Sequence, residues 1–437
     1  MRCLALKPLR MVYLDKPEPE GSDRGREERR RWIVAPAPSE SATEVEGLRL
    51  LDELPRDIAT SLFQWLRDAL LWSQVGPGAR TGLFGSPSVL YEMPGWIEAA
   101  ATPESLRGAR TAFLMLAVEP AGITPQALGS ACAAISEWAN RMGLTNTELV
   151  FSRAAARVDS ENSDLAFRAG RAARRNSRYE EAQGWFRRAV GLARRADDDA
   201  AYTSAFLGWG VLEQARGNPD RARKRFVRAW RRAKGGRLPK LAAAARHYLI
   251  ALSVGNFREG IRHAIAAYKL YGPGDHRLAA LASDTGAFLS DHRHFSSSRP
   301  LFEAALPLLG DSPDRLVPLG NLARAVAAMG DRKTFTGLWL EANRRGDAHA
   351  ETLPDALIEL AEGARTLGLF RKAEATLQEA ISAAEQRREP AALHRATTVL
   401  AELHSKPPDQ DLPASPEIRR FVRRFVRRLR KQAASGR

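Results

Sequence analysis

The 437-residue sequence has little cysteine, little lysine and no long apolar segment. Its two cysteines, Cys3 and Cys132, are too far apart for a disulfide framework or a zinc-binding spacing, so we expect a reducing, cytoplasmic location. The longest apolar run, 111–118, is far shorter than the ~20 residues that cross a bilayer. Lys7 and Arg10 interrupt the apolar patches near the N-terminus, which argues against a signal peptide.

Motifs that carry catalysis or bind cofactors are also missing. The sequence has no His-Glu-x-x-His, no Gly-x-Ser-x-Gly and no Rossmann fingerprint, and the glycine-rich stretch 76–95 lacks the order of a P-loop. The only histidine cluster, His292 and His294, has a spacing that does not share one helix face, and no further ligands complete a metal set. We therefore expect no enzymatic activity, no metal site and no cofactor.

Positive charge is abundant, and arginine supplies most of it. Of the 67 basic residues only ten are lysine, and the formal net charge is +16. Arginine binds phosphate and carboxylate groups in a bidentate manner that lysine cannot match, although a GC-rich genome produces the same bias. A positive field of this size favours acidic proteins, nucleic acid or anionic lipid as partners.

One helix–turn–helix pattern recurs six times between residues 163 and 404. Each copy has a small residue, a turn, and then a small and a bulky residue at helical spacing, and the copies follow one another at intervals of 37–40 residues. Small residues let two helices approach, and the aromatic residue is expected to fill the space between neighbouring hairpins. The residues expected to make this packing are Gly170, Tyr179, Ala182, Phe186, Gly210, Ala222, Phe226, Gly286, Phe302 and Ala373.

This repeat resembles the tetratricopeptide-repeat (TPR) family over about residues 163–404, with units longer than the family's usual period of about 34 residues. One hairpin cannot bury its apolar face alone, so stacked units are expected. The predicted fold is all-α, a right-handed α-solenoid of TPR-like repeats with a helical N-terminal region. We divide the chain into an irregular arm (1–43), a helical region (44–123), the solenoid (124–404), a proline-rich loop (405–416) and an arginine-rich C-terminal helix (417–437).

The C-terminal helix is amphipathic. Its apolar residues recur at i, i+3, i+4, i+7 and i+8 from Ile418 to Leu429. Three interpretations are open: it docks on the last repeat as a cap, it lies on an anionic membrane surface, or it contacts nucleic acid or an acidic partner. The residues expected to make such contacts are Arg419, Arg420, Arg423, Arg424, Arg427 and Arg428.

The resemblance implies a protein–protein interaction scaffold whose concave groove is lined by the first helix of each repeat. An arginine cluster there suits an acidic peptide or a C-terminal carboxylate, while ordinary solvated charge is the simpler interpretation. The leading hypothesis is a cytoplasmic bacterial adaptor. The alternatives are a peptide-responsive receptor that regulates a transcription or defence effector, and a nucleic-acid-associated factor that uses the tail. The predicted groove residues are Arg168, Arg171, Arg174, Arg175, Asn321, Arg324, Glu359, Glu362 and Arg365.

Overall fold

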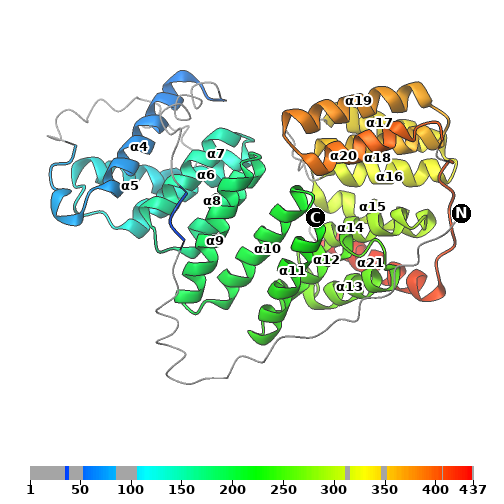
Figure 1. The fold of residues 1–437 in the computed structure, drawn as a ribbon, viewed down its shortest axis with the longest axis horizontal. Helices are drawn as coiled ribbons and strands as arrows, with labels where there is room; N and C mark the ends of the chain where they lie inside the picture. The colour runs from blue at the N-terminus through cyan, green and yellow to red at the C-terminus, as the bar shows by residue number, and fades with distance from the viewer. Residues whose placement is uncertain are drawn as a thin grey trace, which may run out of the picture.

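The computed structural model describes residues 35–38, 53–84, 106–310, 315–345, 352–405 and 407–435, and in these ranges the chain is helical with no β-strand (Figure 1). The expected arm at 1–43 lies outside them apart from 35–38. The predicted all-α fold is confirmed. The elements are α4 (Arg56–Gln74), η1 (Pro77–Ala79), α5 (Arg107–Val118), α6 (Pro125–Arg141), α7 (Thr145–Val158), α8 (Ser163–Arg175), α9 (Tyr179–Arg195), α10 (Asp199–Ala215), α11 (Pro219–Gly235), α12 (Pro239–Ala251), α13 (Phe257–Tyr271), α14 (Leu278–Asp291), α15 (Phe295–Leu309), α16 (Leu316–Ala328), α17 (Arg332–Arg345), α18 (Leu353–Thr366), α19 (Phe370–Gln386), α20 (Pro390–Ala401) and α21 (Pro416–Ser435).

Helical hairpins stack one on the next along the chain. The pairs α6/α7, α8/α9, α10/α11, α12/α13 and α14/α15 each pack closely, and the second helix of a pair then packs on the first helix of the following pair. The helices α4 and α5 lie against α6 and α7 at the start of the array. This arrangement is the α-solenoid of stacked helical hairpins that the repeats predict.

Helix ends follow from local chemistry. Thr124 accepts a hydrogen bond from the Ala127 amide (3.2 Å) with Pro125 in the first turn, and Asn256 caps α13 through the Glu259 amide (3.1 Å). Several turns use a left-handed residue, for example Gly217 at φ 73°. Gly255, in the turn between α12 and α13, does not take a positive φ.

Glycine and phenylalanine hold the two helices of a hairpin together. A Cβ on Gly170 would lie 2.9 Å from the Phe186 ring, and one on Gly210 would lie 2.3 Å from Phe226. Phe186 also lies against Gly208 of the next hairpin, where a Cβ would come within 2.6 Å. The same aromatic side chain therefore packs within its hairpin and against its neighbour, and no side chain larger than hydrogen fits opposite it.

The array curves with the first helices on the inside. Consecutive first helices (α8, α10, α12, α14, α16, α18, α20) contact one another, whereas consecutive second helices touch little or not at all in the described residues. Helices that are closer together on one side of a stack must line the inside of its curve. The inner layer is therefore formed by the first helices and the outer layer by the second helices.

Two places depart from the regular stack. The helix α16 packs more extensively on α18 than on its own partner α17, and Gly320 permits this because its Cβ position is 2.7 Å from the Ala356 carbonyl oxygen. The helices α13 and α14 pack less extensively than other successive helices. At this opening the C-terminal helix α21 packs against α15 and α14 and against Tyr268 of α13.

The docking of α21 uses its whole apolar stripe. Tyr268 contacts Phe425 at 4.8 Å and Phe421 at 5.6 Å between ring centroids. Of the three interpretations of this helix, the cap on the last repeat is wrong about the place, because the helix folds back onto the middle of the array (Figure 1). The buried residues of α21 are Ile418, Phe421, Val422, Phe425, Val426 and Leu429.

Candidate partner-binding groove

The first inner helix, α8, presents the four predicted groove arginines. Two of them are paired inside the chain. Arg168 Nε lies 2.7 Å from Asp164 Oδ2, and Arg175 Nη1 lies 3.2 Å from Glu148 Oε1. Arg168 Nη1 also lies 3.6 Å from Glu137 Oε2 of α6, and Glu148 belongs to α7, so both arginines join α8 to neighbouring helices and are less available to a partner than the sequence suggests.

Arg171 and Tyr248 occupy a concave part of the inner layer. Arg171 is exposed and pairs with no carboxylate in the described residues, yet burial among surrounding protein lowers its pKa, and the charges of Arg175 and Arg174 lower it further. Tyr248 of α12 is 37% exposed, but burial raises its pKa while Arg174 opposes that shift. Both side chains therefore meet water on the inner layer while neighbouring protein surrounds much of each.

The far end of the array returns to this part of the inner layer. Arg387, at the turn between α19 and α20, donates from Nη2 to the Arg175 carbonyl oxygen (3.3 Å), and α20 contacts α10. Glu389 of the same turn raises the pKa of Tyr179, after the larger effect of burial. The inner face is thus partly closed by its own last helix.

The opposite pole of the inner layer is an ion-pair network across α14, α16, α18 and α20. Arg324 lies 3.0 Å from Glu359 and 3.4 Å from Asp291. Arg395 lies 2.6 Å from Glu359 and 2.7 Å from Asp355. Because the network contains more carboxylates than guanidinium groups, its exposed members leave this pole negative.

A segment that we name the strap, residues 407–412, completes the network. Asp409 accepts from Arg324 Nε (2.9 Å), and Arg365 Nη1 donates to the Pro407 carbonyl oxygen (2.9 Å). The strap ends on the turn between α14 and α15, where the Leu412 amide donates to Arg293 O (2.7 Å). It carries the chain from α20 back to α21 along the edge of the solenoid (Figure 1).

The pKa values in this network show which charges are compensated. Burial disfavours the charge of Arg324, but Glu359, Asp409 and Asp291 outweigh burial and raise its pKa. Burial likewise opposes ionisation of Glu359, but Arg324 and Arg395 lower its pKa. Burial and the neighbouring Glu359 raise the pKa of Asp291, so Asp291 is the under-compensated carboxylate of the group.

The remaining predicted groove residues lie within this network rather than on open surface. None of the five is more than 8% exposed: Asn321, Arg324, Glu359, Glu362 and Arg365. The accessible charges beside them are Asp284, Asp291, Asp355 and Arg395, with side chains between 45% and 54% exposed. The sequence interpretation did not name these four, although each lies on a first helix: Asp284 and Asp291 on α14, Asp355 on α18 and Arg395 on α20.

The predicted tail arginines point away from the solenoid, with one exception. Arg428 donates from Nη1 to the Tyr268 carbonyl oxygen (3.0 Å) and stacks at 4.7 Å from the Tyr268 ring. The exposed members are Arg419, Arg420, Arg423, Arg424 and Arg427. They lie in the outer layer and not in the groove.

The histidine cluster has structural roles. His292 contacts the carbonyl oxygens of Phe288 (2.8 Å) and Val254 (3.0 Å), and His294 contacts that of Leu412 (2.9 Å). Among the described residues, no group of three or more His, Cys, Asp or Glu could hold a metal ion. Nor does any described helix combine the length and apolar character needed to cross a membrane.

Comparisons with known proteins identify no family for this chain. No family model matches it and no curated protein matches it. A solved structure described as "Crystal Structure of Rap Protein Complexed with Competence and Sporulation Factor" aligns with 84% of this chain and 99% of its own, at 9% identity and a TM-score of 0.35. A likeness at that level carries no argument, so the proposals below rest on this chain's own geometry.

Proposed function

We propose that this chain is an interaction scaffold that binds a peptide, or an exposed segment of a partner protein, along its inner layer. The observation that carries the proposal is the inner surface of α8 and α12, where Arg171 is exposed with no carboxylate at ion-pair distance in the described residues and Tyr248 is accessible. An acidic side chain or a C-terminal carboxylate would supply the missing partner of Arg171.

The polarity of the inner layer suggests how such a peptide would lie. Arg171 forms the positive pole on α8, and Asp284 and Asp291 on α14 form the negative pole. Tyr248 lies between them, because both Arg174 and Asp284 influence its pKa. A segment with a carboxylate at one end and a basic group at the other would match both poles.

A random peptide library displayed on phage tests the proposal directly. Full-length protein should enrich peptides that carry a carboxylate, and their binding should be weakened about tenfold or more by Arg171→Glu, since each tenfold corresponds to about 1.4 kcal/mol. The matched control is Arg371→Glu, a reversal at an exposed position on α19. Equal enrichment and equal affinity for the wild type and Arg171→Glu would overturn the assignment of the groove.

A second candidate function is a peptide-responsive receptor. The observation that favours it is the contact from Arg387 to the Arg175 carbonyl oxygen, which joins the two ends of the inner layer and lies beside the proposed site. A ligand that competes for this region would change the curvature of the solenoid. Such a receptor would transmit binding to a transcription or defence effector.

Small-angle scattering separates the receptor from a static scaffold. A peptide selected from the library should increase the radius of gyration of the full chain if it opens the contact at Arg387. Arg387→Ala should produce part of that change without peptide. A radius of gyration that saturating peptide does not change would exclude the receptor hypothesis and retain the static scaffold.

A further inference from the structure

The positive charge of this protein is concentrated in the outer layer. The helices α11 and α21 each carry eight basic residues and one acidic residue, a net charge of +7 apiece, and α9 and α13 carry +2 each. Their total of +18 exceeds the net charge of the whole chain, +16. The eight first helices from α6 to α20 together carry only +1. Composition does not produce such a division by itself.

These four helices follow one another on the same side of the molecule. The helices α9, α11 and α13 are consecutive second helices, and α21 packs beyond α13 against α15 (Figure 1). Packed helices are about 8–10 Å apart, and consecutive second helices are spaced more widely because they hardly touch. The row therefore extends on the order of 30 Å, close to one turn of a nucleic-acid duplex.

Arginines on α9 and α11 are held in place by aromatic rings of α10. The Arg225 guanidinium lies 3.6 Å from the Trp209 ring centroid, and Arg187 approaches the same ring at 5.9 Å. Arg228 lies 5.0 Å from the Phe206 ring. Stacking fixes the plane of a guanidinium and leaves its N–H edge directed outward, which lowers the entropic cost of binding an oxyanion.

Three exposed or half-buried arginines of α9 and α11 have no ion-pair partner. Within the described residues, no carboxylate lies at ion-pair distance from Arg187, Arg221 or Arg225. Burial lowers the pKa of Arg225, and although Glu213 opposes this, the like charges around it lower it further. Positive charges that repel one another and have no carboxylate partner are stabilised when an anion binds beside them.

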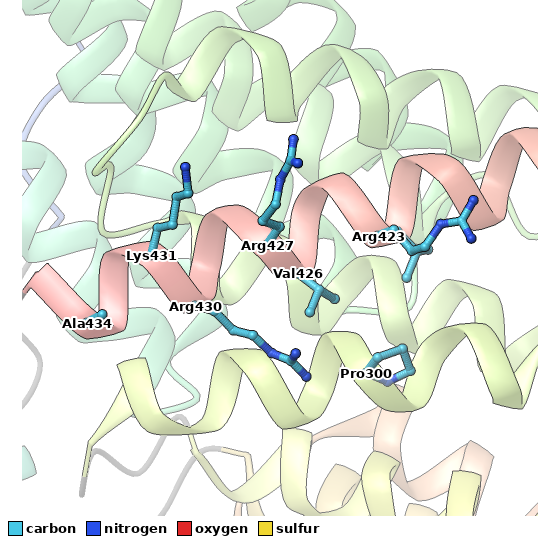
Figure 2. Close-up of a pocket in the computed structure, with 8 residues that line it drawn as sticks. Pro300, Arg423, Val426, Arg427, Arg430, Lys431 and Ala434 are labelled. Carbon is cyan, nitrogen blue, oxygen red and sulfur yellow. The ribbon is translucent and has the colours of Figure 1, made fainter.

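The α21 end of the row adds a hollow of about 640 Å³. Figure 2 shows Val426 and Arg430 of α21 directed toward α15, which carries Pro300, whereas Arg427 and Lys431 extend to the other side of α21. The remaining lining residues are Val422, Arg423 and Ala434. Four of the eight lining residues are thus cations, beside a recess large enough for a sugar–phosphate group.

We propose that the outer face formed by α9, α11, α13 and α21 binds the phosphate backbone of a nucleic-acid duplex without reading its sequence. Insertion of α21 into a membrane does not fit, because its apolar stripe is already buried against the solenoid. An acidic protein would match the positive charge of this face. It would not match the length of the row, because the cations continue over several successive helices. Repeating phosphates match such a row.

Fluorescence anisotropy of the full chain with a 30-base-pair DNA duplex tests the proposal. If the face neutralises about four to six phosphates, the affinity should fall by about 10²–10³ between 50 and 200 mM salt. A duplex of the same length in RNA distinguishes the two sources of phosphate, and binding of either duplex supports the proposal. No binding of both at 50 mM salt overturns it.

Charge reversals on the face locate the binding site. The pairs Arg221→Glu with Arg225→Glu on α11, and Arg423→Glu with Arg427→Glu on α21, should each weaken binding at least tenfold and reduce the salt dependence. The matched control, Lys333→Glu with Arg371→Glu on α17 and α19, makes the same change of charge elsewhere and should weaken binding less than threefold. Control and face variants that lose affinity equally would overturn the site.

Two further measurements keep the result interpretable. Arg225→Lys retains the charge but loses the planar guanidinium that stacks on Trp209. It should therefore bind the duplex more weakly than wild type and more strongly than Arg225→Glu. An unchanged circular dichroism spectrum would show that the variant is folded. Polyglutamate of matched length tests the acidic-protein alternative: if it binds and both duplexes do not, the nucleic-acid proposal is wrong. Arg171→Glu, in the inner groove, should leave duplex binding unchanged.

Discussion

The inner and outer layers of this solenoid handle charge in opposite ways. Inside, charges of both signs meet across helices, as Arg324 does with Glu359 and Asp409. Outside, α11 and α21 accumulate charge of one sign, and Arg225 stacks on an aromatic ring instead of pairing. The difference follows from solvation: an unpaired charge in a buried site costs several kcal/mol, while water stabilises an exposed one at little cost to folding. The outer layer can therefore carry unpaired charges that remain accessible to a partner.

The largest expected effect tests how α21 is held in the outer layer. Phe425 is fully buried against Tyr268, so Phe425→Ala should weaken docking of the helix by about 3–5 kcal/mol. Trypsin should then cleave the arginine-rich tail faster by between about 10² and 4 × 10³, since each tenfold corresponds to about 1.4 kcal/mol. Glu417→Ala, an exposed change in the same helix, should leave the cleavage rate unaltered; a rate for Phe425→Ala equal to wild type would show that the stripe does not hold the helix.

The next effect compares one arginine from each layer. Arg324→Met removes the nearest cation of the buried Asp409 and leaves Glu359 with Arg395 as its one ion-pair partner in the described residues, which should lower the free energy of unfolding by about 3–5 kcal/mol. Arg225→Met removes a stacked outer arginine and should cost less than about 1 kcal/mol. Urea unfolding of both variants measures the difference. Similar losses in the free energy of unfolding would show that charge contributes to stability in the same way in both layers.

A smaller effect is expected where the two layers meet. Gly210→Ala places a methyl group 2.3 Å from Phe226, so overpacking of about 1–3 kcal/mol should outweigh the gain of about 1 kcal/mol in helix propensity. Gly337→Ala on α17 meets nothing within 4 Å and should be neutral or stabilising. Thermal unfolding compares the two. Stabilisation by Gly210→Ala would mean that the Phe226 ring moves aside at no cost.

The smallest effect has the opposite sign and depends on pH. The pKa of Asp291 is raised above its unfolded value, so its ionised form destabilises the fold at neutral pH and protonation relieves this. Asp291→Asn should stabilise the protein by less than about 1 kcal/mol at pH 7, because the half-exposed side chain is screened. The gain should shrink as the pH falls toward 4, which urea titrations at both pH values measure.

In the same titrations, protonation of Glu359 should change the stability in the opposite direction. Its folded pKa is lowered, so its contribution to stability is present above the unfolded pKa and is lost as the pH falls through the folded value. Wild-type protein should therefore lose stability in acid even as the penalty at Asp291 is relieved. A larger gain from Asp291→Asn at pH 4 than at pH 7 would contradict the assigned sign.

The hairpin pattern could be read from the sequence because it depends on neighbours close along the chain. Gly170 and Phe186 lie in one hairpin, and the requirement for a small residue opposite a ring is local. The position of α21 could not be read, because an apolar stripe specifies that the helix must be covered but not by which helices. The opening between α13 and α14 decides that, and it depends on several repeats together.

Which arginines are available to a partner was also beyond the sequence. Arg171 and Arg324 are both predicted groove residues on first helices, yet one is exposed and the other is 8% exposed within an ion-pair network. The strap makes the difference, since Asp409 is 85 residues from Arg324 along the chain. Nothing near Arg324 in the sequence announces that contact.

The sequence by itself determined the helices, the repeat and the net positive charge, because periodicity, capping and composition act over a few residues or over the whole chain. Only the tertiary structure decided the division of charge between layers and the return of α21 to the middle of the array. Burial and pairing depend on which distant segments approach one another, and that approach sets whether an arginine such as Arg225 or Arg324 stabilises the fold or remains accessible to a partner.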